Sequence, residues 1–162
     1  MKKTIKRRRK ENKTDYLNRI KLLKSDSPRL VLRKTNKYFI AQYVTSEEAQ
    51  DKIEFGVTSK NLIKYGWPKE ALGSLKSIPA AYLTGYLFGK KIINQKKKVP
   101  IVDFGMMRCL HKTKPFGFLK GLNDSGIKIN SEKEIFPDES KINREGDKIP
   151  FEKIKLNIEK NA

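Results

Sequence analysis

Two reactive side chains, Cys109 and His111, lie close together in the sequence. A structural zinc site needs about four ligands, and the chain has no other cysteine or histidine. A catalytic cysteine would need a third orienting group and an oxyanion site, which this spacing does not supply. We therefore expect no metal here, and we interpret Cys109 as a small packing residue.

Residues 85–91 contain two glycines followed by two lysines, which is close to the pattern of a phosphate-binding loop. The glycines are one residue too close together, and Lys91 stands where Ser or Thr would hold magnesium. The segment also lies in a predicted helix, so Gly85 and Gly89 are interpreted as points of close helix packing. Asp103 ends an apolar segment without a second acid nearby, which favours a structural role over a catalytic one. We expect no enzyme, no cofactor and no small-molecule substrate.

The N-terminus is the strongest candidate for binding chemistry, since seven of its first ten side chains are basic. Arg7, Arg8 and Arg9 each offer a fork of donors that matches two phosphate oxygens. Residues 1–13 cannot bury a core, so this segment is expected to be a flexible arm that orders on binding. A solvated tail or a localisation signal is the alternative interpretation.

The whole chain has the same bias, with 37 basic and 18 acidic side chains in 162 residues and a formal net charge of +19. Such a charge is usually neutralised by a polyanion, and nucleic acid is the default partner. The most apolar window, residues 78–93, is interrupted by glycines and lysines and is too short to span a bilayer. With a single cysteine and no secretory segment, we expect a cytoplasmic protein that does not act at a membrane.

The pattern of apolar residues predicts one α/β domain, in which a mixed β-sheet is flanked by helices. Thr14 is expected to cap a helix that runs to Lys24. Strands are expected at 29–33 and 38–44 as a hairpin, at 52–57, and as a short buried strand at 99–104. Helices are expected at 79–94, and at 116–125 as a second crossover that Gly126 ends.

The C-terminal part of the chain is less clearly patterned. Asp138 could cap a short helix that runs to Arg144, and apolar residues recur between Phe151 and Ile158. That last segment could dock on a neighbouring molecule as easily as on its own core. The predicted division is an RNA-binding arm at 1–13, an α/β domain at 14–144 and a C-terminal tail at 145–162.

Basic residues also occur beside aromatic and amide side chains, a combination that is typical of RNA recognition. Such residues lie on the first predicted helix (Lys13, Tyr16, Arg19) and at the hairpin (Arg33, Lys34, Asn36, Lys37). The single tryptophan, Trp67, lies between Lys64 and Lys69. It could stack on a base or cover the edge of the core, and the sequence favours neither alternative. We include Trp67 among the candidate RNA-contacting residues.

An ordered series of short motifs runs through the chain and resembles one protein family. The motifs are Arg7-Arg8-Arg9, Lys13-Thr14-Asp15-Tyr16, Leu22-Leu23-Lys24-Ser25, Pro28-Arg29-Leu30-Val31, Ile40-Ala41-Gln42, Lys64-Tyr65-Gly66-Trp67, Pro79-Ala80-Ala81-Tyr82-Leu83-Thr84-Gly85, Gly89-Lys90-Lys91, Asp103-Phe104-Gly105 and Lys120-Gly121-Leu122. Together they resemble the archaeal and eukaryotic branch of the universal large-subunit ribosomal protein eighteen family. The stretch from Leu110 to Phe118 departs from the family pattern.

The resemblance implies a structural ribosomal protein that binds 5S rRNA at the central protuberance of the large subunit. It also implies contacts with the large-subunit rRNA, with ribosomal protein five and with other proteins of the central protuberance. By position, the RNA-contacting residues of the family fall on Arg7, Arg8, Arg9, Lys10, Lys13, Thr14 and Tyr16, with Arg19, Arg33, Lys34, Asn36 and Lys37 as further candidates.

Two alternative functions remain open at this point. An α/β nucleic-acid-processing enzyme would need clustered acids to hold magnesium, whereas Asp103 is isolated in the sequence. A non-specific polyanion-binding protein, for example one that meets an anionic membrane surface, would need only the charge. Such a protein would not discriminate among RNAs.

Overall fold

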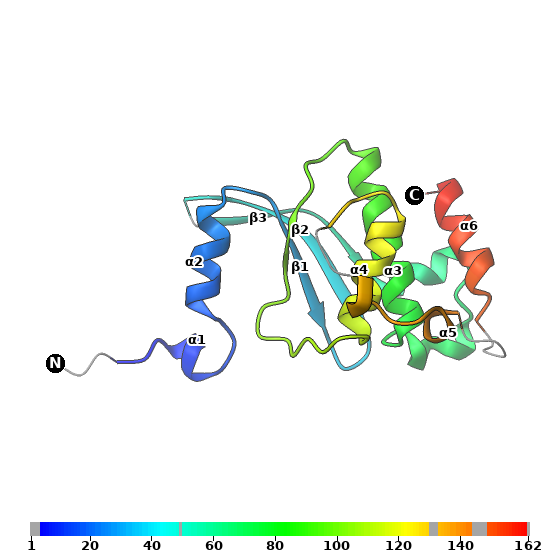
Figure 1. The fold of residues 1–162 in the computed structure, drawn as a ribbon, viewed down its shortest axis with the longest axis horizontal. Coiled ribbons are helices and arrows are strands. Elements are labelled where there is room, and N and C mark those ends of the chain that lie inside the picture. The colour runs from blue at the N-terminus through cyan, green and yellow to red at the C-terminus, as the bar shows by residue number, and fades with distance from the viewer. Residues whose placement is uncertain (1–3, 49, 130–132, 144–148, 162) are drawn as a thin grey trace.

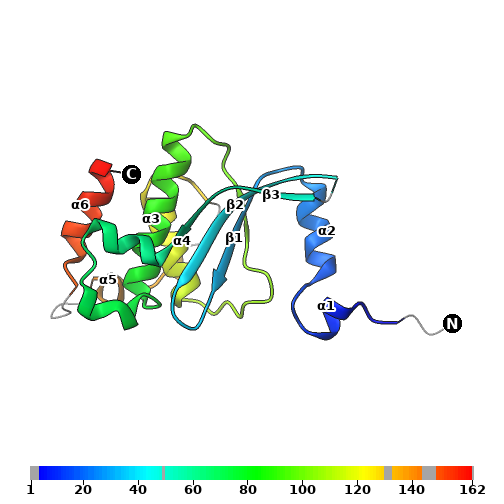
Figure 2. The ribbon, with the colours of Figure 1, turned by 180° about the vertical axis from the view of Figure 1, so that it is seen from behind.

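A computed structural model describes residues 4–48, 50–129, 133–143 and 149–161 of the chain. The elements follow in the order α1 (Arg7–Lys10), α2 (Tyr16–Lys24), β1 (Arg29–Lys34), β2 (Phe39–Glu47), β3 (Gln50–Thr58), η1 (Ser59–Tyr65), η2 (Lys69–Ser74), α3 (Ile78–Asn94), β4 (Ile101–Asp103), α4 (Lys114–Asp124), η3 (Lys133–Ile135), α5 (Glu139–Ile142) and α6 (Phe151–Asn161). Figures 1 and 2 both show α1 and α2 at one end of the molecule and α6 at the other.

The four strands form one mixed sheet in the order β3-β2-β1-β4, which confirms the predicted α/β fold. β1 pairs antiparallel with β2 and β2 with β3, as a hairpin followed by a third strand should. β4 lies parallel to β1 at the sheet edge, so α3 is the crossover that returns the chain to it. Ile101 of this edge strand is 36% exposed, and the expectation of a buried strand is therefore wrong for this residue.

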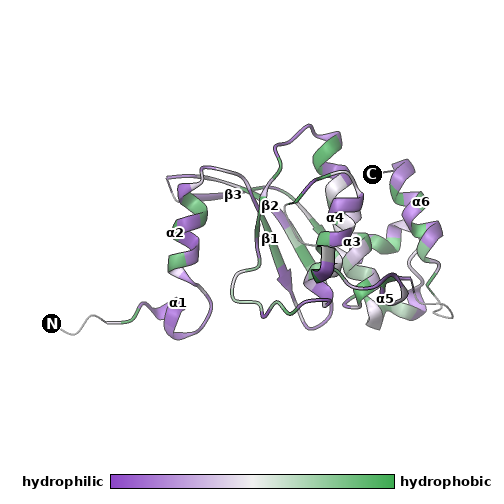
Figure 3. Cartoon of the chain, in the orientation of Figure 1, coloured by the Kyte–Doolittle hydropathy of each residue, from purple (hydrophilic) through white to green (hydrophobic). Residues whose placement is uncertain are grey.

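The central helix α3 supplies much of the core, and Ser77 caps its first turn by accepting a hydrogen bond from the Ala80 N–H. One face of the sheet packs on this helix: Tyr43 stacks on Phe55, whose ring centroid lies 5.2 Å from that of Phe88. Figure 3 shows hydrophobic colours gathered in α3 and the strands, whereas α1 is hydrophilic. The core therefore lies on one side of the sheet.

The glycines of residues 85–91 pack against α4, as their helical position predicts. A Cβ atom at Gly85 would lie 2.1 Å from the Phe118 carbonyl oxygen, and one at Gly121 would lie 2.0 Å from that of Tyr82. α4 begins at Lys114, slightly earlier than expected, and Gly126 follows it with a φ of 111°. Because no further strand follows α4 in the described part of the chain, the expectation of a second crossover is wrong.

The C-terminal helix α6 docks on the protein's own core, which decides between the two alternatives for this segment. Ile154 and Ile158 are fully buried, and the Phe151 ring packs at 5.4 Å from that of Tyr82 in α3. The Tyr86 hydroxyl donates a hydrogen bond to Glu159. Asp138 precedes α5 but makes no capping hydrogen bond, and Arg144 lies outside the described residues. The division into arm, domain and tail stays a prediction.

Candidate nucleic-acid interface

The basic N-terminal segment forms one short helical turn, α1, in which all four residues are Arg or Lys and none is buried. Asn12, at a φ of 52°, ends the turn in a left-handed conformation. The Lys13 N–H then donates to the Arg8 carbonyl and the Asn12 N–H to the Arg9 carbonyl, the hydrogen bonds of a Schellman cap. This cap turns the chain so that α2 can follow while α1 keeps its four cations exposed.

Two contacts attach α1 to the start of α2. The Arg8 Nε donates to the Thr14 hydroxyl at 2.9 Å, and the Lys6 ammonium lies 4.4 Å from the centroid of the Tyr16 ring. The cap of α2 is Asp15, whose carboxylate accepts from the N–H groups of Leu17 and Asn18, whereas Thr14 lies one residue before the cap. The helix is as expected, but the prediction of Thr14 as its cap is wrong.

A charged side chain links α2 to the sheet, since no residue of α2 is buried. Arg19 of α2 binds Asp51 at 2.9 Å, and Asp51 also binds Arg29, which is only 2% exposed. Arg29 in turn lies 3.6 Å from Asp103, and Arg33 lies 3.4 Å from the same carboxylate oxygen. We call Arg19, Asp51, Arg29, Asp103 and Arg33 the ion-pair ladder, and it fixes the direction in which α2 and the arm leave the domain.

The pKa of Asp51 reflects this environment. Partial burial would raise it, but hydrogen bonds from Ser46 and Arg19 and the charges of Arg29 and Arg19 together lower it below the ordinary value of 3.8. A depressed pKa stabilises the folded state above the ordinary value, and that contribution is lost as the pH falls through the lower folded value.

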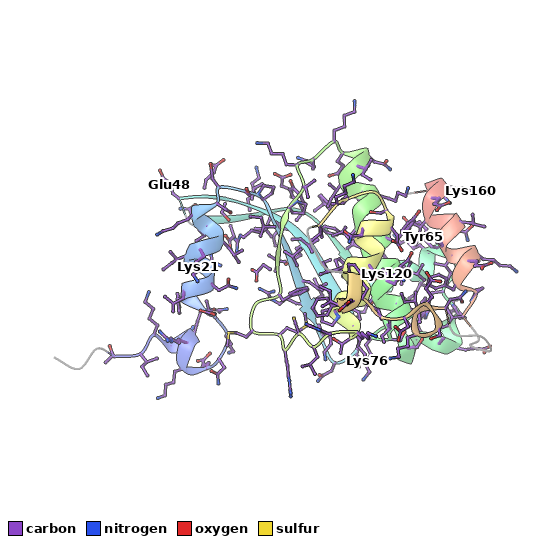
Figure 4. The ribbon with its side chains drawn as sticks, in the orientation of Figure 1. Lys21, Glu48, Tyr65, Lys76, Lys120 and Lys160 are labelled. Atoms are coloured by element: carbon purple, nitrogen blue, oxygen red, sulfur yellow. The ribbon has the colours of Figure 1, made fainter. Side chains whose placement is uncertain are left out.

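We therefore expect Asp51→Asn to lower the free energy of unfolding near neutral pH and to have less effect as the pH falls below about 4. Urea titrations across this range measure the difference between the two proteins. Glu48→Gln is the matched control, because Glu48 is an exposed acid at the turn of the β2–β3 hairpin, three residues before Asp51 (Figure 4). A constant difference at every pH would contradict the role given to the Asp51 carboxylate.

The arm, α2 and the sheet enclose a small hollow of about 130 Å³, which we call the arm hollow. Its lining brings together five of the residues expected to contact RNA, namely Arg8, Lys13, Thr14, Arg19 and Arg33. The Arg33 guanidinium lies over Gly105, where a Cβ atom would be 2.8 Å from its Cζ. Cations from three separate elements therefore meet at one place, next to the exposed Arg7, Arg9 and Lys10.

The other predicted residues lie away from the arm hollow. Lys34, Asn36 and Lys37 are exposed at the tip of the β1–β2 turn, where the Thr35 hydroxyl accepts from the N–H groups of Lys37 and Tyr38. Tyr16 lies partly exposed under Lys6. The structure thus separates the candidates into an arm group and a turn group.

Trp67 is the one candidate that the structure removes from the surface. Its side chain is 2% exposed and belongs to the hydrophobic core, and its indole N–H donates to the Ala71 carbonyl at 3.0 Å. Since its ring could not stack on a base without opening the core, the inclusion of Trp67 among the RNA-contacting residues is corrected. It covers the core beside η1.

A second and larger hollow was not predicted from the sequence. It measures about 590 Å³ and is lined by Lys34, Arg108, Lys112, Lys114 and Lys141 together with apolar side chains. These cations come from β1, the loop before α4, the start of α4 and α5. The segment from Leu110 to Phe118, where the family resemblance departs, forms part of its wall. We call it the basic hollow.

The residues first considered for catalysis have structural roles. Asp103 is buried in the ion-pair ladder and accepts the Gly105 N–H. Burial raises the pKa of the Cys109 thiol, which makes it a poorer nucleophile, and His111 lies edge-on to the Phe116 ring. Within the described residues, no group of three or more His, Cys, Asp or Glu side chains is placed to hold a metal ion.

Comparison with known proteins places these features in a family. Residues 2–100 match the family described as "Ribosomal large subunit proteins 60S L5, and 50S L18". The chain is 41% identical to the large ribosomal subunit protein uL18 of Korarchaeum cryptofilum over 139 residues, which cover 86% of this chain and 69% of that protein. The chain belongs to the uL18 family. The uL18 proteins of Methanosphaera stadtmanae and Methanoregula boonei are 42% and 40% identical over the same share of this chain, covering 70% and 78% of their own lengths.

Membership of the uL18 family makes the chain a component of the large ribosomal subunit. The family membership therefore identifies the chain as a structural ribosomal protein and not as an enzyme. None of the helices in the described ranges has the length and apolar character needed to cross a membrane. The family match covers α1, α2, the hairpin, β3 and α3, and therefore the whole of the arm hollow except its lining from residues 103 and 105.

Proposed function

We propose that this uL18 protein binds 5S rRNA and helps attach it to the large subunit at the central protuberance. The observation that carries the proposal is the meeting of Arg8, Lys13, Arg19 and Arg33 around the arm hollow, beside the exposed cations of α1. Arginine forks bind phosphate oxygens in pairs, and the formal charge of +19 needs a polyanion to neutralise it.

The proposed mechanism is binding without turnover. The cations of the arm neutralise phosphates and release counterions, which supplies affinity for any RNA. The ion-pair ladder holds α2 and Arg33 in a fixed relation, so the arm meets the RNA backbone in one geometry. Selectivity for one RNA shape then comes from the rigid part of the surface, whereas affinity comes from the charge.

The same proposal assigns the partners. Besides 5S rRNA, the large-subunit rRNA, ribosomal protein five and other proteins of the central protuberance are expected neighbours. The proposed RNA contacts are Arg7, Arg8, Arg9, Lys10, Lys13, Thr14, Tyr16 and Arg19 around the arm, with Arg33, Lys34, Asn36 and Lys37 on or beyond β1. Thr14 contributes through its hydrogen bond from Arg8, which orients that guanidinium.

A competition titration between 5S rRNA and transfer RNA tests the proposal directly. At about 0.2 M salt, charge is screened within less than about 10 Å, so long-range attraction contributes little to the difference. We expect 5S rRNA to displace a labelled 5S rRNA probe at a concentration at least about tenfold lower than transfer RNA does, a difference of about 1.4 kcal/mol. If the two RNAs competed equally well, the protein would bind RNA through its charge alone, and the proposed function would be rejected.

A further inference from the structure

The basic hollow combines a cationic rim with an apolar lining. Its cations are Lys34, Arg108, Lys112, Lys114 and Lys141, and between them lie Ile78, Met107, Leu110 and Pro115. The volume of about 590 Å³ is within the range of roughly 300–1,000 Å³ that is usual for sites that bind small ligands. Leu110 is 51% exposed, so apolar surface at this site is left in contact with water.

The positive charge of the basic hollow is only partly compensated. Asp138 lies 3.4 Å from Lys112 and 3.6 Å from Lys141, whereas no acid in the described residues lies within 4.0 Å of Lys34, Arg108 or Lys114. Burial lowers the pKa of Lys114, and the charges of Lys34 and Lys76 lower it further. Lys76 lies at the lower edge of the molecule in Figure 4. A bound anion would relieve this repulsion.

The basic hollow and the arm hollow open on different sides of the sheet. Arg33 lines the arm hollow and Lys34 lines the basic hollow. Because successive side chains of a strand point to opposite faces, these two neighbours are directed away from each other. The loop after β4 lines both hollows, with Gly105 at the arm hollow and Arg108 at the basic hollow. The two hollows are therefore separate basic sites.

We propose that the basic hollow binds an unpaired nucleotide of RNA as a second contact, separate from the arm. Arg108 and Lys114 hold its phosphate, while Met107, Leu110 and Pro115 receive the base. The choice of RNA rather than another polyanion rests on the proposed function. Unpaired bases offer a flat apolar face beside a charged phosphate, which matches this lining, whereas the bases of a duplex are stacked inside it. An acidic peptide would supply the charge without that face.

The test is a photo-crosslinking experiment with the full chain and a single-stranded oligouridine that carries 4-thiouridine. After protease digestion, mass spectrometry identifies the crosslinked peptides. We expect a crosslink in the segment from Met107 to Pro115, and we expect R108Q/K114Q to reduce it about tenfold. K153Q/K160Q is the matched control, because it removes the same charge from exposed positions of α6 and should retain the crosslink.

A second variant tests the apolar lining without changing the charge. Leu110→Ser is expected to reduce the same crosslink several-fold while the affinity for a duplex RNA of equal length stays unchanged. Thermal unfolding of each variant checks that the fold is retained. A crosslink that is absent from this segment, or equally strong in R108Q/K114Q and K153Q/K160Q, would overturn the proposal.

Two further outcomes separate the possible explanations. If polyglutamate suppresses the crosslink as well as unlabelled oligouridine does, the occupant is an acidic protein segment and the RNA proposal is rejected. The variant R7A/R8A/R9A should keep the crosslink at the basic hollow, since the arm lies on the other side. If the full chain gave no crosslink at the basic hollow but still preferred 5S rRNA over transfer RNA, only the second contact would be rejected. The proposed function would then be unaffected.

Discussion

Replacing Arg7, Arg8 and Arg9 together by alanine is expected to weaken the binding of 5S rRNA by more than about tenfold at about 0.2 M salt. All three guanidinium groups belong to a helical turn without buried residues, so phosphates can reach them. Arg8 keeps further N–H donors beside its bond to Thr14, and the contact of Arg7 with Glu11, at 3.9 Å, is exposed. The fold should survive, because the turn adds nothing to the core and its cap is made by backbone groups. In this variant the affinity for 5S rRNA should therefore fall while the free energy of unfolding stays nearly the same.

The salt dependence gives this prediction a second readout. Each neutralised phosphate contributes about 0.7 to 0.9 to the slope of log affinity against log salt, so the slope should become less steep by roughly 2 to 3. The control K128A/K153A/K160A removes the same charge from exposed positions far from α1 in the sequence. An unchanged slope and affinity in the arm variant, or loss of folding, would contradict the role given to the arm.

Gly121→Ala is expected to destabilise the protein by roughly 3 kcal/mol, the upper part of the range for overpacked cores. The added Cβ would lie 2.0 Å from the Tyr82 carbonyl oxygen and 3.0 Å from the Tyr86 nitrogen, both backbone atoms of α3. Backbone atoms in the middle of a helix cannot rotate away, so α3 and α4 must move apart. Because α3 supplies much of the core, that separation weakens packing well beyond the substituted residue.

Urea unfolding followed by circular dichroism measures this loss, which should lower the melting temperature by roughly 10 °C for a chain of this size. Gly73→Ala is the matched control, since nothing lies within 4 Å of a Cβ atom at Gly73. We expect this control to be within about 0.5 kcal/mol of the wild type. If Gly121→Ala behaved like Gly73→Ala, the close contact between α3 and α4 would not exist in solution.

Local pattern was sufficient to predict most elements of the fold. Residues 78–94 form a helix because apolar residues recur at helical spacing and because Ser77 and Pro79 both favour its first turn. The hairpin follows from two runs of strand-forming residues separated by a short polar turn. The bounds of the strands differ more: β2 and β3 extend to Glu47 and from Gln50, beyond the expected 38–44 and 52–57, whereas β4 is shorter than the expected 99–104.

Contacts between distant residues decided what local pattern could not. Thr14 and Asp15 are both good capping residues; in the structure Asp15 caps α2, and the Thr14 hydroxyl accepts a hydrogen bond from Arg8 instead. Trp67 is equally suited to a surface or a core edge, and it is buried because η1, η2 and the core meet around it. The basic hollow escaped prediction because its cations come from parts of the chain that are far apart in the sequence, and only the packing of β1, α4 and α5 brings them together.

By itself, the sequence determined that this protein is a basic α/β protein of the uL18 family with an arginine-rich arm, because charge, periodicity and motif order are properties of the chain. Only the tertiary structure decided which cations act together. Arg33 joins the arm through the ion-pair ladder, whereas Lys34, the next residue, faces the other side of the sheet. The physical reason is that a strand directs neighbouring side chains to opposite faces, and only the packing of distant segments determines what each face meets.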